Sequence, residues 1–150
     1  MRRGKHGVIA VLEEGSTVGQ GHQDQWLGYL SQCGTRGIPL ETELVVGETP
    51  ATVNDLLRQA QADLHVGQEA TWTLMAFATY LEEDETWKAA NGETWNLPRV
   101  IEMELDADLH SSACGGSHGL YGWATAVNTY GSRHPEAGET LPEAWQAAAL

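Results

Sequence analysis

One tripeptide occurs three times along this chain of 150 residues, as Gly47-Glu48-Thr49, Gly92-Glu93-Thr94 and Gly138-Glu139-Thr140. The copies are 45 and 46 residues apart, and a second segment recurs at the same spacing, Ala62-Asp63-Leu64-His65 as Ala107-Asp108-Leu109-His110. Two unrelated segments that recur with one period and in one order indicate an internal structural repeat. We therefore predict about three repeats of 45–50 residues.

Each repeat is expected to hold two helices. Helices of one kind follow the tripeptide, at residues 53–64 and 97–105. Helices of the other kind end at Tyr29, Tyr80 and Tyr130. The apolar residues of both kinds have the spacing of a helix rather than the alternation of a strand.

Local signals support the helix starts. Thr52, with Asp55 three residues later, is typical of an N-terminal capping box. Pro98 suits a first helical turn, where its missing N–H costs nothing. Glycine in the tripeptides favours turns, and short extended pieces such as Leu44-Val45-Val46 indicate small hairpins there.

Because a single helical hairpin cannot bury its own apolar face, the repeats must stack. We predict an all-α fold, one domain over residues 1–150, built as an open solenoid or an arc of an α/α toroid with short β-hairpin turns at the Gly-Glu-Thr sites. Residues 145–150 are apolar and no polar capping unit follows them. We therefore expect a fragment of a longer toroid, or a homo-oligomer that covers this C-terminal helix.

The composition excludes several partner classes. Eight Lys and Arg stand against 21 Asp and Glu, a net charge of −13, which argues against binding nucleic acid or an anionic membrane. A content of 41% hydrophobic residues excludes a disordered acidic tail. No apolar run approaches the length of about 18 residues that a membrane span requires. The basic start leads only into a short apolar stretch at residues 8–12, so we predict no secretory signal and a cytoplasmic protein whose two cysteines are thiols.

A glycine-rich segment at residues 111–122 contains the densest set of reactive side chains, including Cys114 and His118. It opens the helix that ends at Tyr130, and a helix start offers free N–H groups. A thiolate and an imidazole are suitable zinc ligands, or a nucleophile and its base. The alternative is a structural turn with a buried thiol and a capping histidine.

His22 and Asp24 open the helix that ends at Tyr29, and Glu69 lies before the helix that ends at Tyr80. If the repeats stack in register, starts of this kind of helix gather at one end of the array. We therefore predict one site with Cys114, His118, His22 and Asp24 as catalytic residues. Cys114, His118 and His22 would be the ligands of zinc, with Glu69 as a carboxylate partner.

Aromatic and further acidic residues complete the candidates. Six tryptophans against one phenylalanine could line a substrate pocket or fill the core. The predicted substrate-binding residues are Trp26, Glu69, Trp72, Tyr121 and Trp123. Glu102 and Asp106 lie four apart on a helix, where they could do acid/base work or face water.

Three segments invite comparison with a known family: residues 5–27, Gly67-Gln68-Glu69-Ala70-Thr71-Trp72-Thr73-Leu74 and Ala113-Cys114-Gly115-Gly116-Ser117-His118-Gly119-Leu120-Tyr121-Gly122. Together they resemble bacterial, chiefly planctomycete, proteins described as terpene cyclase/prenyltransferase-like or squalene-oxidase-repeat proteins. The resemblance covers about residues 5–131 and implies an α/α toroid, in chains longer than this one. The Asp-x-Asp-Asp and Asp-Asp-x-x-Asp signatures of the cyclases are absent from the sequence, so triterpene cyclisation is not expected. Protein prenyltransferases and lanthionine cyclases hold zinc with Cys, His and, in some, Asp, and the predicted site is similar in residue type.

These observations predict an enzyme-like domain that acts on a small or extended organic substrate. Hydrolysis or elimination by a Cys/His site, with zinc-activated water or a thiolate, is the leading hypothesis. The first alternative is a carbohydrate-active hydrolase, with Glu69 or Glu102 as acid/base and Trp72 or Trp95 as the sugar platform. The second is a non-enzymatic helical-repeat module whose acidic surface binds a basic partner.

Overall fold

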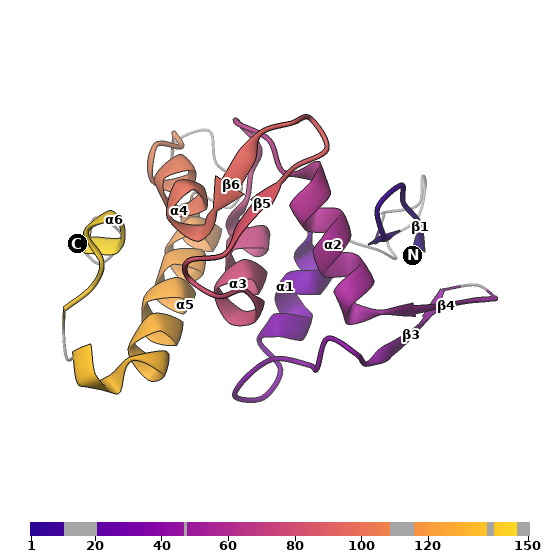
Figure 1. The fold of residues 1–150 in the computed structure, drawn as a ribbon, viewed down its shortest axis with the longest axis horizontal. Helices are drawn as coiled ribbons and strands as arrows, with labels where there is room; N and C mark the ends of the chain where they lie inside the picture. Colours follow the sequence, from indigo (N-terminus) through magenta and orange to yellow (C-terminus); the bar gives the residue numbers. More distant parts are fainter. Residues whose placement is uncertain (11–20, 47, 109–115, 138–139, 147–150) are drawn as a thin grey trace.

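The computed structural model describes residues 1–10, 21–46, 48–108, 116–137 and 140–146. These residues form helices and pairs of short strands (Figure 1). In chain order they are β1 (Arg2–Arg3), β2 (Val8–Ile9), α1 (Gln25–Ser31), β3 (Glu43–Val46), β4 (Thr49–Thr52), α2 (Val53–Asp63), α3 (Thr71–Tyr80), β5 (Thr86–Lys88), β6 (Thr94–Asn96), α4 (Leu97–Leu105), α5 (Ser117–Arg133), the 3₁₀ helix η2 (Pro135–Ala137) and α6 (Glu143–Gln146).

The all-α prediction is wrong. The described residues form three antiparallel two-stranded sheets, β1–β2, β3–β4 and β5–β6, beside the helices, so the fold class is mixed α/β rather than an all-helical solenoid or toroid arc. The β3–β4 and β5–β6 hairpins lie around the first two Gly-Glu-Thr sites. The β1–β2 pair was not expected, because two strands of two residues each are too short to show an alternating pattern.

The β5–β6 hairpin is part of the core rather than a surface turn. Trp87 and Trp95 face each other across its two strands, and aromatic cross-strand pairs stabilise a sheet. Trp95 is fully buried, and the ring of Trp87 contacts Phe77 of α3 at a centroid distance of 5.1 Å. Burial of the Trp95 ring and partial burial of the Trp87 ring explain why the chain forms a hairpin here instead of a solvated loop.

The predicted helix starts are confirmed. The Thr52 amide donates to the Asp55 carboxylate at 2.9 Å in a capping box at the start of α2. α4 begins at Leu97, with Pro98 in its first turn, and the Asn96 side chain accepts from the Arg99 amide at 3.0 Å. Short-range hydrogen bonds of this kind depend on residues three apart, which explains why sequence alone located them.

α3 lies in the middle of the molecule, between α1 and α5 (Figure 1). It is buried from Thr71 to Ala78, as expected of a helix that is apolar on every side. Two glycines allow this close packing: a Cβ at Gly28 of α1 would lie 2.8 Å from the Trp72 ring, and one at Gly122 of α5 would lie 3.1 Å from the Thr71 carbonyl. α1 and α5 therefore each pack directly against α3, which brings the first residues of the three helices close together. Of the predicted ends at tyrosine, only that of α3 is confirmed, because α1 continues to Ser31 and α5 to Arg133.

α2 and α4 are amphipathic and add their apolar faces to this core, with Leu57 and Ile101 among the buried side chains. At the C-terminal end, Trp145 of α6 is buried and its ring lies 5.1 Å from that of Tyr130. Residues 147–150 lie outside the described part of the chain, so the homo-oligomer stays a prediction. Within the described residues, no helix combines the length and the apolar character needed to cross a membrane.

Candidate functional site

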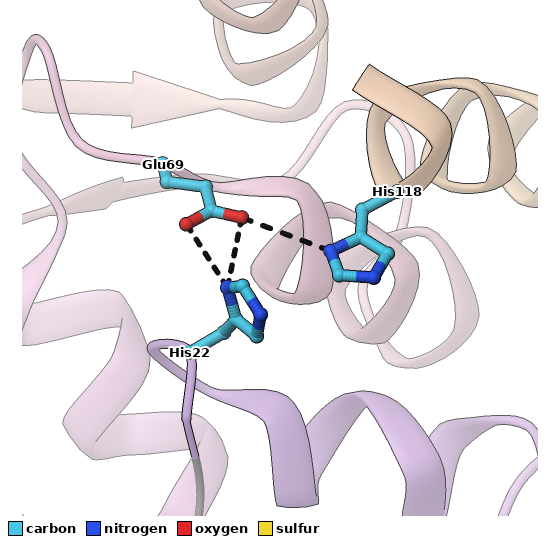
Figure 2. A group of neighbouring side chains, drawn as sticks. All are labelled: His22, Glu69 and His118. Carbon is cyan, nitrogen blue, oxygen red and sulfur yellow. Dashed lines mark hydrogen bonds and ion pairs between the residues drawn. The ribbon is translucent and has the colours of Figure 1, made fainter. Parts of the chain in front are cut away.

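Three side chains from the starts of α1, α3 and α5 meet at one point (Figure 2). His22 Nδ1 lies 3.1 Å from Glu69 Oε1 and 3.2 Å from Oε2. His118 Nδ1 lies 4.0 Å from Glu69 Oε1, and the two imidazole rings meet edge to face with centroids 4.8 Å apart. One ligand atom from each residue lies within 4.8 Å of the other two, close enough to hold a metal ion. We call these three residues the His–Glu–His cluster.

His22 lies in the turn before α1. The residues that follow His22 attach this turn to α3. Asp24 takes left-handed backbone angles, with φ of 56°, and its carbonyl accepts from the Gly28 amide at 2.8 Å. The Thr73 hydroxyl of α3 donates to the Asp24 carboxylate at 2.6 Å. This bond fixes the His22 turn to the central helix.

Glu69 is placed by the turn that leads into α3. Gly67 has φ of 83°, a conformation that favours glycine, and the amide of Ala70 donates to the Glu104 carboxylate of α4 at 2.6 Å. The turn is therefore bound to α4 immediately after Glu69. His118 lies in the first turn of α5 itself, so the helix backbone places it without a separate turn.

Trp72 packs beside both imidazoles. Its ring centroid lies 5.2 Å from that of His118 and 6.4 Å from that of His22, with Tyr29 on a further side at 4.8 Å. His22 and His118 remain partly exposed, with 20% and 24% of their side chains accessible, and Glu69 is exposed to 39%. The cluster is thus supported by aromatic rings and open to solvent.

A pocket of about 630 Å³ adjoins the cluster, and Glu69 and His118 form part of its wall. Glu104, which is buried, also lines it. Burial raises the pKa of Glu104 to about 7; the Ala70 hydrogen bond opposes the rise and the neighbouring charge of Glu69 adds to it. A volume of this size suits a small organic ligand.

The prediction that helix starts of one kind gather is confirmed for His22, Glu69 and His118. Asp24 does not join them: its carboxylate is bound to Thr73 and lines a separate pocket of about 270 Å³. Burial raises the pKa of Asp24 to about 6, against the lowering effect of the Thr73 hydrogen bond. Cys114 lies in residues 109–115, outside the described part of the chain, so its roles as catalytic residue and metal ligand stay predictions.

The predicted substrate-binding residues are divided among different places. Trp123 lines the pocket beside the cluster, and Glu69 belongs to both the pocket and the cluster. Trp72 is nearly buried behind the imidazoles. Tyr121 is exposed and lines another groove, and Trp26, also exposed, contacts the ring of Tyr29.

Sequence reasoning missed the importance of Glu104 and of two neighbours in the pocket wall, Gln68 and Thr71. A usable signal for Glu104 existed, because it follows Leu97, Val100 and Ile101 at the spacing of the buried face of α4. A carboxylate at a core position of a helix is unusual and commonly marks a functional site.

No family model, curated protein or solved structure matches this chain. The geometry of the site therefore carries the functional argument. Two imidazole nitrogens and one carboxylate form a ligand set found in metal enzymes, and it borders a pocket that also holds a buried carboxylate.

Proposed function

We propose that this protein is a zinc-dependent hydrolase whose metal ion is held by His22, Glu69 and His118. The observation that carries the proposal is that these three residues, from three helix starts far apart in sequence, present ligand atoms within 4.8 Å of one another. Two histidines and one glutamate are the protein ligands of several catalytic zinc sites, where a fourth position stays open for water or substrate. Zinc in such a site lowers the pKa of bound water to about 7 and polarises a carbonyl.

The hydrogen-bonding state of the cluster supports a metal. Among the described residues, His118 Nδ1 is buried and has no hydrogen-bond partner, since Glu69 at 4.0 Å is too distant. An unpaired buried nitrogen carries a free-energy cost that a metal ion would relieve. Ligand atoms around tetrahedral zinc lie about 3.3 Å apart. The ligand atoms of the cluster lie within 4.8 Å of one another, so binding requires the widest separation to close by about 1.5 Å at most, within reach of side-chain rotation.

Zinc binding itself is the first test. Purified protein, stripped with a chelator and titrated with zinc in a calorimeter, is expected to bind one equivalent. Glu69→Gln is expected to weaken binding strongly, because the amide loses the negative charge. Glu48→Gln removes an equivalent charge from an exposed turn and should bind as the original does. A protein that binds no zinc, or equal affinity in both variants, would contradict the proposal.

Turnover is the second test. Aryl esters, acyl amides and peptides are offered to the zinc-loaded protein and to the chelator-treated protein. We expect hydrolysis that disappears on chelation, returns with added zinc and is absent from Glu69→Gln. Hydrolysis that survives chelation would contradict a metal mechanism.

A carbohydrate-active hydrolase is the second candidate, favoured by one observation. Glu104, whose pKa lies near 7, shares the pocket with the partly exposed Glu69, and Trp95 and Trp123 line the same pocket. Two carboxylates in contrasting environments are typical of the acid and the base of glycosidases. Glycoside cleavage that needs both Glu69 and Glu104 but no zinc would support this candidate against the first.

A further inference from the structure

The pocket beside the His–Glu–His cluster is strongly acidic. Among the described residues that line it, the carboxylates are Glu69, Glu102, Glu104, Asp106 and Asp108, and Arg99 is the one Lys or Arg. Arg99 already pairs with groups other than these five carboxylates. Its guanidinium lies 3.2 Å from Glu93 and also donates to the Thr94 carbonyl. Acidic side chains thus outnumber basic ones along this wall, and a concave site lined mainly by one sign of charge attracts ions of the opposite sign.

Buried hydrogen-bonding groups in the same wall lack partners. Gln68 is 9% exposed, and neither its amide oxygen nor its amide nitrogen has a hydrogen-bond partner among the described residues. Thr71 is 6% exposed, and its hydroxyl is equally unpaired there. Both residues line the pocket. Since buried polar groups are nearly always hydrogen-bonded, these two indicate a ligand that supplies the missing partners: N–H donors for the Gln68 and Thr71 oxygens, and an acceptor for the Gln68 amide nitrogen.

One positively charged side chain already packs against an aromatic ring in the pocket wall. The guanidinium carbon of Arg99 lies 3.9 Å from the centre of the Trp95 ring, a cation–π contact. Trp123 offers a second indole in the same pocket. Aromatic faces together with carboxylates are the combination that recognises ammonium and guanidinium groups.

We propose that this pocket binds the ammonium or guanidinium group of a cationic organic substrate, with the buried carboxylate of Glu104 as its anchor and Gln68 and Thr71 as acceptors. Glu104 suits this role because one of its oxygens accepts from Ala70 while the side chain forms part of the pocket wall. The proposal names the substrate class of the same site and so rests on the proposed function: the scissile group would lie toward the His–Glu–His cluster, which Glu69 and His118 place at the pocket wall.

Three probes of similar size and different charge test the proposal: benzylammonium, benzyl alcohol and benzoate. Their dissociation constants are measured by calorimetry on the full chain. We expect benzylammonium to bind at least tenfold more tightly than benzyl alcohol, and benzoate to bind more weakly than both. Equal binding of benzylammonium and benzyl alcohol, or preference for benzoate, would overturn the proposal.

The anchor is tested with a matched pair of variants. Glu104→Gln keeps the size of the side chain and an acceptor for Ala70, and is expected to weaken benzylammonium binding about tenfold or more while leaving benzyl alcohol unchanged. Glu41→Gln removes an exposed carboxylate outside the pocket and should leave both constants unchanged. Equal effects of the two changes on benzylammonium would mean that overall charge, not the pocket, attracts the cation, and would overturn the assignment.

All probes are measured on the zinc-free and the zinc-loaded protein, which separates this inference from the proposed function. Preference for benzylammonium in a protein that binds no zinc supports the cation pocket and contradicts the metal site. Zinc binding without any preference among the probes supports the metal site and contradicts the cation pocket.

Discussion

The two ends of α5 each carry a histidine among glutamates, yet the two groups differ in what they leave open. At the C-terminal end, His134 uses both ring nitrogens: Nε2 lies 2.7 Å from Glu83 and Nδ1 lies 3.3 Å from Glu136. At the N-terminal end, two histidines share the single carboxylate of Glu69, and His118 Nδ1 has no hydrogen bond within the described part of the chain. In the first group both ring nitrogens of the histidine are paired, whereas in the second group a ring nitrogen of His118 remains available to bind a ligand.

The helix dipole accounts for part of this difference. The C-terminal end of a helix favours a positive charge, and the hydrogen bond with Glu83, then that with Glu136, raises the pKa of His134 above its usual value. Arg133 adds a second cation there, donating to the Leu81 and Thr79 carbonyls at 2.7 Å each. The N-terminal end favours a negative group, and Glu69 supplies it. A histidine that pairs through both nitrogens serves stability, and one with a nitrogen left unpaired is available to a ligand.

The largest expected effect is on zinc affinity, which should distinguish the two ends of α5. His118→Ala removes a proposed ligand and should weaken zinc binding by about 100-fold or more, since even outer-sphere changes at metal sites cost 10- to 100-fold. His134→Ala, at the other end of the same helix, should leave zinc affinity unchanged. Calorimetric titration of both variants checks this, and an equal loss in both would remove the distinction between the two ends.

The second effect concerns Glu104 and pH. The folded protein binds a proton to Glu104 up to about pH 7, whereas the unfolded chain releases it near pH 4.5, so this contribution to stability is full below pH 4.5 and is lost as the pH rises through 7. Glu104→Gln should remove this loss and raise the free energy of unfolding at pH 8, relative to pH 4.5, by at most about 3 kcal/mol. Urea unfolding at both values measures it. Glu102→Gln, an exposed position on the same helix, is the control, and an identical pH response in the two variants would refute the assignment.

The third effect tests the connection between the His22 turn and α3. Thr73→Val removes the hydroxyl that donates to Asp24 and leaves a buried carboxylate without this partner, which should lower the free energy of unfolding by about 1–3 kcal/mol. Thr79→Val is the matched control, because its hydroxyl bonds to the Met75 carbonyl of its own helix. Zinc affinity should fall in Thr73→Val and not in Thr79→Val; similar values would show that the turn is placed by other contacts.

The smallest effect is expected at the C-terminal end of α5. Glu83→Gln breaks one pair of His134. The two side chains of this pair are 32% and 26% exposed, so thermal stability should drop slightly and the drop should diminish at high salt. Because partners raise the pKa of His134, its contribution is full below the unfolded pKa of about 6.5 and is lost as the pH rises through the folded value. A drop that does not change between pH 5.5 and pH 9 would contradict this.

Several elements could be predicted because their signals are local. The capping box of Thr52 and Asp55 and the first turn with Pro98 depend on residues three apart, so they specify α2 and α4 without tertiary contacts. The regular spacing of three apolar helical segments was enough to predict that their starts gather, and the meeting of His22, Glu69 and His118 confirms it. The all-α class was wrong because strands of two to four residues give no period that a sequence can show.

Other features follow from packing and not from any local pattern. Asp24 and His22 are two residues apart, yet one lies in the cluster and the other bonds to Thr73, because the left-handed backbone at Asp24 turns it toward α3. Glu104 became a pocket residue because α4 packs with that face against the turn at Ala70. Local sequence thus establishes where helices begin and which residue types stand there, since caps and periodicity act over a few residues. Side-chain direction, burial and the shared pocket depend on contacts between elements far apart in the chain, and three-dimensional packing alone specifies them.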